Sequence, residues 1–427
     1  MASDREFLFS LEQIGIKLGL EQIRALLVAL RRPDLAYPSI TIAGTNGKGS
    51  VTAMVERGLR EAGRRTGRYT SPHLVHLEER IAIDGQPIAA SALDRSLARV
   101  RTASTSLPSP PSFFEATTAL ALDVFRESAV DVAVLEVGLG GRLDATNAVT
   151  PIAAAITAIA FDHEEYLGRT IEAIAGEKAG IIKPGIPVIL QENSPDARRV
   201  IEAEAARAGA KVTSTGEFTV VTRAPATLIG PLAGRWTVDV TTPRTRYHDM
   251  TLALRGKHQI ANAATAVGVL DEVLVAAPED ARRRAVYAAL TDVVWPARLE
   301  LLPWRHGHVL IDGAHNPAGA RALAVYIQNT YGRRVPMVVG IMKDKNVDAI
   351  LTALAPSASH FVFTAPASAR AARPEDLVAS AAAIAPVVPA EAIADPLHAV
   401  ERALSHDALV VAGGSLYLAG EIRHGIT

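Results

Sequence analysis

The residue types best suited to chemistry lie close together in Ser39-Ile-Thr-Ile-Ala-Gly-Thr-Asn-Gly-Lys-Gly-Ser50. A β-branched run predicts a strand, which leads into a loop with three glycines and Lys48. Glycine lets backbone N–H groups turn toward an anion, and a following helix adds its positive end. Lys48 supplies charge, and the Ser50 hydroxyl can ligate Mg²⁺. Gly49 separates lysine from serine, unlike the standard Walker pattern, but the stretch still predicts a phosphate-binding loop.

Two further polar groups follow predicted strands. Glu136 ends the apolar run 132–135, where a carboxylate either reaches water at the edge or ligates a metal. His163, in Phe161-Asp-His163, ends the next apolar run, and an isolated histidine is more often structural. A carboxylate and a phosphate-loop serine within reach favour the metal interpretation. Oxygen ligands with one imidazole suit Mg²⁺ beside a triphosphate better than zinc.

Several other candidates keep an ordinary structural alternative. Lys178 and Lys183 could simply lie on a solvated helix face, as most lysines do. Asn262 could cap a helix, and Asp312, at a strand end, is either a cap or a ligand group. Ser415 follows a strand–glycine turn and is either a turn residue or a substrate contact.

Strands that alternate with helices must position these groups. The apolar patterns predict helices over 10–30, 51–62, 116–128 and 171–179, and strands over 132–135, 152–159 and 188–190. This alternation predicts a mostly parallel α/β sheet, in which ligands gather at the carboxyl ends of the strands. The fold class is therefore α/β.

The second half of the chain reads differently. Residues 211–254 alternate as a small antiparallel β region, and helices are predicted over 259–274 and 280–290. Four strands separated by helices then predict a smaller Rossmann-like domain, in which the apolar, alanine-rich stretch 365–395 is helical rather than disordered. We expect the join near Trp295-Pro-Ala-Arg298, which gives domains 1–296 and 297–427.

Together these motifs resemble the folylpolyglutamate synthase/dihydrofolate synthase family of the Mur ligase superfamily. Gly44-Thr-Asn-Gly-Lys-Gly-Ser50 and Tyr69-Thr-Ser-Pro-His-Leu74 carry the resemblance, and further motifs continue it in order from about Ser10 to Glu421. The resemblance implies a Mur-type ATP-binding domain followed by a glutamate ligase domain. Gln259 replaces a frequent asparagine, and Ala297 replaces the usual glycine of the hinge.

The resemblance also implies roles for single residues. The ATP-binding residues would be Thr45, Asn46, Gly47, Lys48, Gly49, Ser50, Asn262, Arg298 and Asp312. One or two Mg²⁺ ions would be held by Ser50, Ser71, Glu136 and His163. Folate or glutamate would contact Arg80, Phe114, His315 and Ser415. Lys48, Lys178 and His315 would be the catalytic residues, with Lys178 carbamylated.

Composition excludes several other classes. Lysine plus arginine (44) balance aspartate plus glutamate (45), so no charge bias favours nucleic acid or an anionic membrane. The absence of cysteine removes disulfides, thiolate catalysis and zinc–thiolate sites. Apolar runs are short, and Asp4, Arg5 and Glu6 argue against a signal peptide. We expect a cytoplasmic monomer.

The expected reaction is ATP-dependent amide formation. ATP would phosphorylate a folate or dihydropteroate carboxylate, and the amine of L-glutamate would attack the acyl phosphate as the two domains close. We favour both glutamate-adding activities over a monofunctional enzyme. A Mur-type peptidoglycan precursor ligase fits less well. Those enzymes have an extra N-terminal domain before the phosphate loop, whereas here the loop already begins at Gly44. A P-loop regulatory NTPase leaves the motif 312–317 and the second α/β series unexplained.

Overall fold

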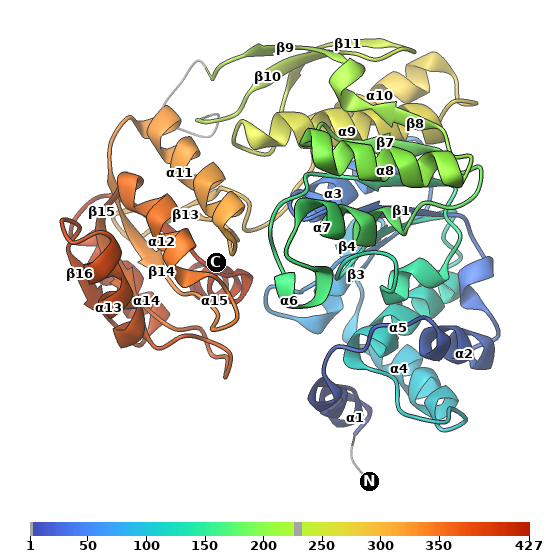
Figure 1. Cartoon of the computed structure of the whole chain (residues 1–427), viewed down its shortest axis with the longest axis horizontal. Helices are drawn as coiled ribbons and strands as arrows, with labels where there is room; N and C mark the ends of the chain where they lie inside the picture. The colour runs from blue at the N-terminus through green and yellow to red at the C-terminus, as the bar shows by residue number, and fades with distance from the viewer. Residues whose placement is uncertain (1–2, 226–232) are drawn as a thin grey trace. The chain divides into compact units, whose positions relative to one another are not determined.

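The chain forms two compact units, each with its own sheet (Figure 1). The computed structural model describes residues 3–225 and 233–427. The first unit runs to Val221 and includes Val238–Met250 and Ala261–Val293. The second contains Thr251–Ile260 and Val294–Thr427, with the described residues of Thr222–Thr237.

An eight-stranded sheet forms the centre of the first unit. In sheet order its strands are β4 (Gln86–Pro87), β3 (Ile81–Ile83), β2 (Thr66–Tyr69), β5 (Val132–Glu136), β1 (Ser39–Ala43), β6 (Ala153–Ile156), β7 (Val188–Leu190) and β8 (Val212–Ser214). The pairs from β2 through β8 are parallel, whereas β3 and β4 add antiparallel pairs at one edge. The predicted mostly parallel α/β sheet is confirmed.

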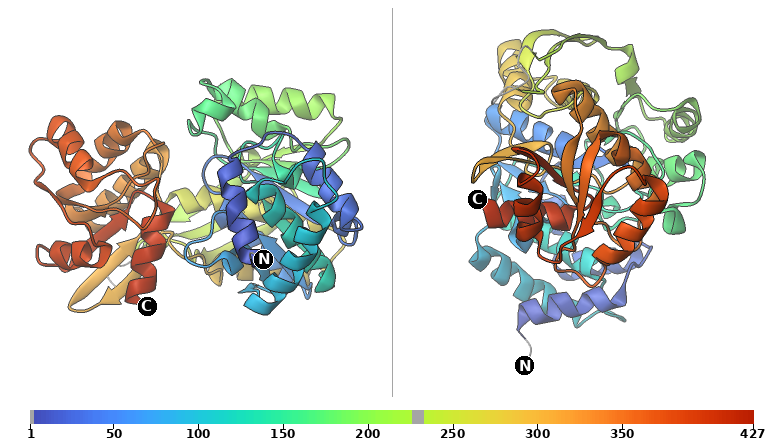
Figure 2. Two further views of the ribbon diagram at one scale, coloured as in Figure 1. Left: turned by 90° about the horizontal axis from the view of Figure 1, so that it is seen from below. Right: turned by 90° about the vertical axis from the view of Figure 1, so that its left-hand side faces the viewer.

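Helices cover both faces of this sheet, as Figure 2 shows. The helices of this unit are α1 (Asp4–Ser10), α2 (Glu21–Ala29), α3 (Lys48–Glu61), α4 (Ala90–Ser104), α5 (Phe113–Glu127), α6 (Glu164–Leu167), α7 (Ile171–Ala179), α8 (Pro195–Arg207), α9 (His258–Val273, which starts in the second unit) and α10 (Glu279–Thr291). A Cβ on Gly67 would lie 2.6 Å from the Phe125 ring of α5, whereas the next residue, Arg68, lies 3.6 Å from Glu56 of α3. Neighbouring strand residues point to opposite faces, so α3 and α5 cover opposite sides of β2.

The N-terminal prediction of one helix over 10–30 is wrong. The structure has a 3₁₀ turn at Leu11–Ile14, then an irregular segment, and α2 only from Glu21. Gly15 and Gly19 have φ values of 74° and 150°, which a helix does not contain. Leu18, which matched the helical spacing, is exposed.

The prediction of one antiparallel region over 211–254 is partly wrong. β8 instead extends the large sheet in parallel with β7, because α8 supplies the crossover that parallel strands need. The remaining strands, β9 (Thr219–Arg223), β10 (Thr237–Thr241) and β11 (Arg246–Thr251), form a separate three-stranded sheet in the order β11-β10-β9.

The second unit contains a six-stranded sheet. In sheet order its strands are β12 (Glu300–Trp304), β13 (Gly307–Ile311), β17 (Leu409–Gly413), β14 (Val335–Val339), β15 (Ala358–Phe363) and β16 (Ala390–Ala392). Its helices are α11 (Pro317–Tyr331), α12 (Val347–Leu354), α13 (Pro374–Ile384), α14 (Pro396–Leu404) and α15 (Leu416–Ile426). All pairs are parallel except β12 with β13.

Both edge strands of this sheet were missed by the sequence analysis. β16 is only Ala-Glu-Ala, and β12 contains Pro303, so neither has a strong strand pattern. The core of the unit packs Leu323 and Ile327 of α11 and Leu351 of α12 against strand residues such as Phe361. The stretch 365–395 contains α13, as predicted, and also β16.

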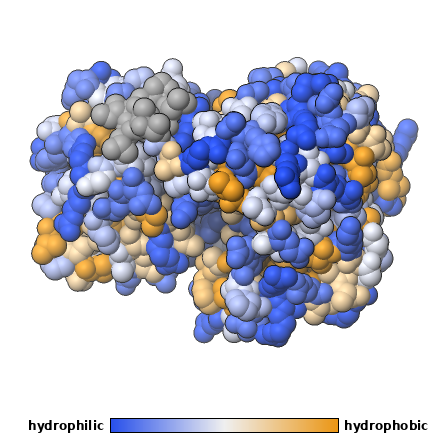
Figure 3. Space-filling model, turned by 90° about the horizontal axis from the view of Figure 1, so that it is seen from above, coloured by the Kyte–Doolittle hydropathy of each residue, from blue (hydrophilic) through white to orange (hydrophobic). Residues whose placement is uncertain are grey.

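The outer surface is mostly hydrophilic, with apolar residues in small separate groups on the face drawn in Figure 3. Within residues 3–225 and 233–427, no helix combines the length and the apolar character needed to cross a bilayer.

Candidate active site

Two glycines fix the path of the loop between β1 and α3. Gly44 has φ 146°, and a Cβ there would lie 1.8 Å from Oγ1 of Thr157. Gly47 has φ 93°, and its Cβ would lie 2.3 Å from Oδ1 of Asn262. Both positions therefore exclude a side chain, both by backbone conformation and by lack of space. The loop runs directly against the residue after β6 and against α9.

The first half of the loop is held by the chain that follows β6. The N–H groups of Thr45 and Asn46 both donate to the carbonyl oxygen of Ala158, at 2.8 and 3.3 Å. The Thr45 hydroxyl donates to the carbonyl oxygen of Ala160 at 3.0 Å. Any anion contact of these two residues must therefore use other atoms. Lys48, Gly49 and Ser50 follow this loop as the first turn of α3.

Two lysines converge on one carbonyl oxygen in this loop. Nζ of Lys48 donates to the oxygens of Gly44 and Thr45 at 3.1 and 3.2 Å, and Nζ of Lys178 donates to Gly44 at 2.8 Å. Lys178 is buried in α7, so it does not lie on a solvated helix face. Burial, followed by the nearby charge of Lys48, lowers the pKa of Lys178 to about 7.

Two of the predicted metal ligands, Glu136 and Ser71, contact each other, and a third, His163, lies beside Asp162. Glu136 is buried at the end of β5, opposite Ile42 of β1, and its Oε2 accepts from the N–H of Ser71 at 3.4 Å. His163 has a left-handed backbone (φ 52°), and its Nε2 lies 3.8 Å from Asp162. The charge of Asp162 also acts on Lys178. The sequence analysis did not single out Asp162, although a carboxylate next to a strand-end histidine was a usable signal.

The loop after Glu136 connects these groups to α5. A Cβ on Gly138 would lie 2.4 Å from the Phe114 ring, and one on Gly141 would lie 2.9 Å from the carbonyl oxygen of Lys178. Asp144 shapes the loop by accepting from the N–H groups of Leu139 and Thr146, at 2.8 and 3.0 Å.

Arg80 lies beside the aromatic residues that begin α5. Its guanidinium stands 5.2 Å from the centre of the Phe113 ring, and its Nε is 2.9 Å from Nδ1 of His73. Burial, followed by the charge of Arg80, lowers the pKa of His73 to about 4, so the imidazole is neutral at physiological pH. The Phe114 ring lies 6.1 Å from that of Tyr69. His73 and Phe113 were not predicted site residues, although His73 lies inside the motif 69–74 and Phe113 precedes the predicted contact Phe114.

Asp312 organises the predicted site of the second unit. It follows β13, and its two carboxylate oxygens accept from the N–H groups of Leu299 and Ala314, each at 2.9 Å. Burial raises the pKa of Asp312, against the opposing charge of Arg298. A Cβ on Gly313 would lie 2.4 Å from Nη1 of Arg298. Arg298 and Asp312 therefore lie on either side of the same glycine.

The loops after β13 and β17 lie side by side. Nδ1 of His315 is 2.8 Å from the carbonyl oxygen of Gly313, and the N–H of Gly414 donates to Ala314 at 3.0 Å. Ser415 is buried and caps α15, because its hydroxyl accepts from the N–H of Leu418 at 3.1 Å. The predicted turn role of Ser415 is therefore present, and a substrate contact would be additional to it.

Comparisons with known proteins match both units. The Mur ligase middle domain matches residues 42–270, and the Mur ligase glutamate ligase domain matches residues 297–416. A dihydrofolate synthase/folylpolyglutamate synthase from Bacillus subtilis is 34% identical over 420 residues, covering 96% of this chain and 95% of the relative. One from Mycobacterium tuberculosis is 39% identical over 383 residues, covering 85% and 77%.

The chain belongs to the folylpolyglutamate synthase/dihydrofolate synthase family. It is accordingly an ATP-dependent ligase. A structure of Mycobacterium tuberculosis folylpolyglutamate synthase complexed with ADP is similar, with a TM-score of 0.90, 35% identity, and coverage of 99% of this chain and 98% of that one. Escherichia coli FolC in complex with DHPP and ADP gives a TM-score of 0.86 at 28% identity, covering 99% and 97%.

Gly44→Ala should damage the phosphate loop of this ligase, because its Cβ would meet Thr157 at 1.8 Å. We expect nucleotide affinity to fall by at least about tenfold, with a lower thermal midpoint. Gly63→Ala is the matched control: Gly63 has φ 79° but nothing within 4 Å of its Cβ, so it measures backbone strain alone. Equal nucleotide affinities for the two variants would contradict the packing argument.

Proposed function

We propose that this chain adds L-glutamate to folates and also to dihydropteroate, through an acyl phosphate, as a monomer in the cytoplasm. Two observations together support the proposal. The loop after β1 has the pattern of a phosphate-binding loop, and two lysines donate to one of its carbonyl oxygens. The chain is also similar, over nearly its whole length, to an enzyme named for both activities. We propose residues 1–296 as the ATP-binding domain and residues 297–427 as the glutamate ligase domain.

The nucleotide phosphates are bound by the start of α3. Lys48, Gly49 and Ser50 form the first turn of α3, and the positive end of a helix favours anions. Lys48 is half-buried, and Nζ can move from the carbonyl oxygens of Gly44 and Thr45 to a phosphate oxygen. Asn262, packed against Gly47, limits this side of the loop and is the proposed adenine contact.

The residues around Glu136 fit Mg²⁺. Glu136 is a buried carboxylate at the carboxyl end of a parallel strand, next to Ser71, and Ser50 is buried in the first turn of α3. Ser50, Ser71, Glu136 and His163 offer hydroxyl, carboxylate and imidazole donors, a set that holds Mg²⁺ together with retained waters. When bound, the ion neutralises charge on the phosphates.

Lys178 is proposed to carry a carbamate. A pKa of about 7 leaves a substantial fraction of the amine neutral at neutral pH, and only the neutral amine reacts with CO₂. The nitrogen forms a bond to carbon and releases one proton. The carbamate nitrogen keeps one N–H, which can continue to donate to Gly44. The modification replaces a positive charge beside Lys48 with a negative one, which removes the repulsion between the two lysines.

The acceptor and amine are assigned to two sets of residues. Arg80 and Phe114 are proposed folate contacts. The guanidinium of Arg80 suits a carboxylate, and the half-buried Phe114 ring, 6.1 Å from that of Tyr69, suits a flat heterocycle. In the second unit, Arg298 and Asp312 are proposed to contact the nucleotide phosphates and ribose. His315 and Ser415 are proposed to contact the reacting phosphate and glutamate.

The first test supplies ATP and L-glutamate with either dihydropteroate or tetrahydrofolate and follows both phosphate release and the glutamylated product. We expect phosphate release that depends on glutamate together with each acceptor. Product from one acceptor alone would restrict the function to a single activity. Phosphate release that ignores both acceptors and glutamate would contradict the ligase proposal and indicate a simple nucleotide hydrolase.

Glu136→Gln should lower turnover strongly, because it keeps the size of the side chain but removes the charge proposed to hold Mg²⁺. We expect at least a hundredfold loss, about 2.7 kcal/mol of barrier, with weak nucleotide binding retained through the loop. Glu61→Gln, on the exposed end of α3, is the control and should keep full turnover. Wild-type turnover of Glu136→Gln at ordinary Mg²⁺ concentrations would remove Glu136 from the site.

Lys178→Ala should abolish activity, and a small carboxylic acid should restore part of it. Lys183→Ala, a change to a half-buried lysine in the following loop, is the control. In wild type, ¹³C-labelled bicarbonate should give a carbamate NMR signal that Lys178→Ala lacks and Lys183→Ala keeps. The neutral amine fraction rises as pH increases through about 7, so labelling at a fixed CO₂ concentration should rise over the same range. An unmodified Lys178 in an active enzyme would refute the carbamate.

A further inference from the structure

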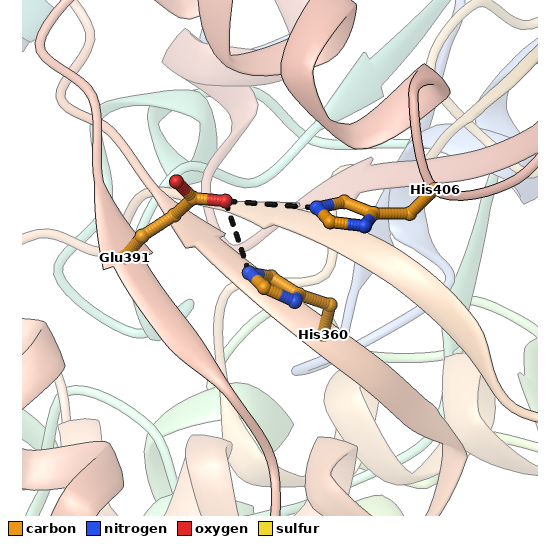
Figure 4. A group of neighbouring side chains, drawn as sticks. All are labelled: His360, Glu391 and His406. Carbon is orange, nitrogen blue, oxygen red and sulfur yellow. Dashed lines mark ion pairs between the residues drawn. The ribbon is translucent and has the colours of Figure 1, made fainter.

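A second group of possible metal ligands lies in the second unit. His360 comes from β15, Glu391 from β16, and His406 from the turn between α14 and β17 (Figure 4). One possible ligand atom from each of the three residues lies within 4.8 Å of the others. The side chains of His360, Glu391 and His406 are 16%, 31% and 32% exposed, so the group is partly covered but open to solvent. The nucleotide, folate and glutamate sites proposed above use none of these residues.

The ligand atoms have a spacing that suits a small cation. Oε1 of Glu391 lies 3.0 Å from Nε2 of His360 and 3.7 Å from Nε2 of His406. Ligands about 2.0–2.1 Å from a tetrahedral zinc ion are roughly 3.3 Å apart, which lies between these two distances. The imidazole rings are stacked, with centres 4.4 Å apart and planes at 21°, so the two side chains lie next to each other. Because a ring nitrogen binds a metal in the plane of its ring, one of the rings must turn about its side-chain bonds when both ligate the same ion. Figure 4 shows both rings directing a nitrogen toward the same carboxylate oxygen.

The contact between His360 and Glu391 is close, but it is not a hydrogen bond. Nε2 of His360 is buried and has no hydrogen-bond partner, although the carboxylate oxygen is 3.0 Å away. A buried ring nitrogen left in this way is costly, and a cation between nitrogen and oxygen would satisfy both.

We propose that His360, Glu391 and His406 form a Zn²⁺ site in the second unit. Two imidazoles and one carboxylate are a donor set that zinc accepts readily, with water in the fourth position. Mg²⁺ suits the set poorly, because it prefers oxygen ligands in octahedral geometry. The bound ion would connect the edge strand β16 to β15 and to the turn before β17. The inference is independent of the proposed ligase activity.

Arg402 competes with the metal for Glu391. Its Nε donates to the same Oε1 at 2.9 Å, so without a cation the carboxylate is already paired. The Arg402 side chain is 48% exposed and can turn toward water or use the second carboxylate oxygen. If the group is only an ion-pair cluster, Arg402 is needed to neutralise Glu391. If the group is a zinc site, removal of the Arg402 charge should make zinc bind more tightly. This opposite dependence separates the two interpretations.

The test measures zinc affinity and stoichiometry of the full chain, without nucleotide, by competition with a chromophoric chelator. His406→Gln and His360→Gln should lose one zinc equivalent or bind it at least about 10- to 100-fold more weakly. His398→Gln, a change to an exposed histidine 3.8 Å from Asp395, should bind as wild type does. Arg402→Gln should bind zinc about tenfold more tightly. Zinc that binds to the proposed Mg²⁺ ligands contributes equally in the wild type and in all four variants. Differences between the proteins therefore report on the second site alone.

Thermal unfolding gives a second readout, because a ligand that binds the folded state raises its midpoint. Zinc should raise the midpoint of wild type, His398→Gln and Arg402→Gln by a step that is absent in His406→Gln, and Mg²⁺ should not replace zinc. Equal zinc affinity in wild type and His406→Gln would overturn the proposal. Weaker zinc binding in Arg402→Gln would also overturn it, and would identify the group as an ion-pair cluster.

Discussion

The organisation of the first unit depends on one carbonyl oxygen, that of Gly44, which accepts hydrogen bonds from two lysines. The arrangement requires β1 to end beside α7 and beside the chain that follows β6. Thr157, in that chain, leaves no room for a side chain at Gly44. The arrangement also places two cationic groups beside the start of a helix, which is itself electropositive. The loop therefore concentrates positive charge, which anion binding or the loss of a lysine proton reduces.

The second unit uses the same construction with the opposite charge. Asp312 follows a parallel strand, is buried, and holds two backbone segments through its carboxylate oxygens. Leu299, one of the residues that it holds, has a left-handed backbone with φ 49°, as does Ala297 with φ 54°. Such conformations are disfavoured for residues with a Cβ, so hydrogen bonds must maintain them. Asp312 therefore sets the backbone around Arg298 before any ligand arrives.

Much of the fold could be predicted, because buried parallel strands and Gly-rich loops have strong local patterns. The apolar runs of β1, β5 and β13, each followed by glycine, predicted where these strands end. Lys48, Glu136 and Asp312 lie at or shortly after those ends. The edges could not be predicted, because β4, β12 and β16 are short, polar or proline-containing and are strands only through their neighbours. The convergence of Lys178 on Gly44 joins residues far apart in sequence, so no local pattern contains it. Phe113 was missed for a similar reason, because its contact with Arg80 joins two different elements. Asp162 was missed although its neighbour His163 gave a local signal.

The weak edge strands have a consequence for how this protein behaves at high concentration. β4 and β12 contain Pro87 and Pro303, and β8 and β16 are each three residues long. Proline removes a backbone donor, and a short strand offers few groups for pairing, so another chain finds little template at either end of the two large sheets. Proline and short length, which made these strands difficult to predict from the sequence, thus also reduce aggregation by strand addition.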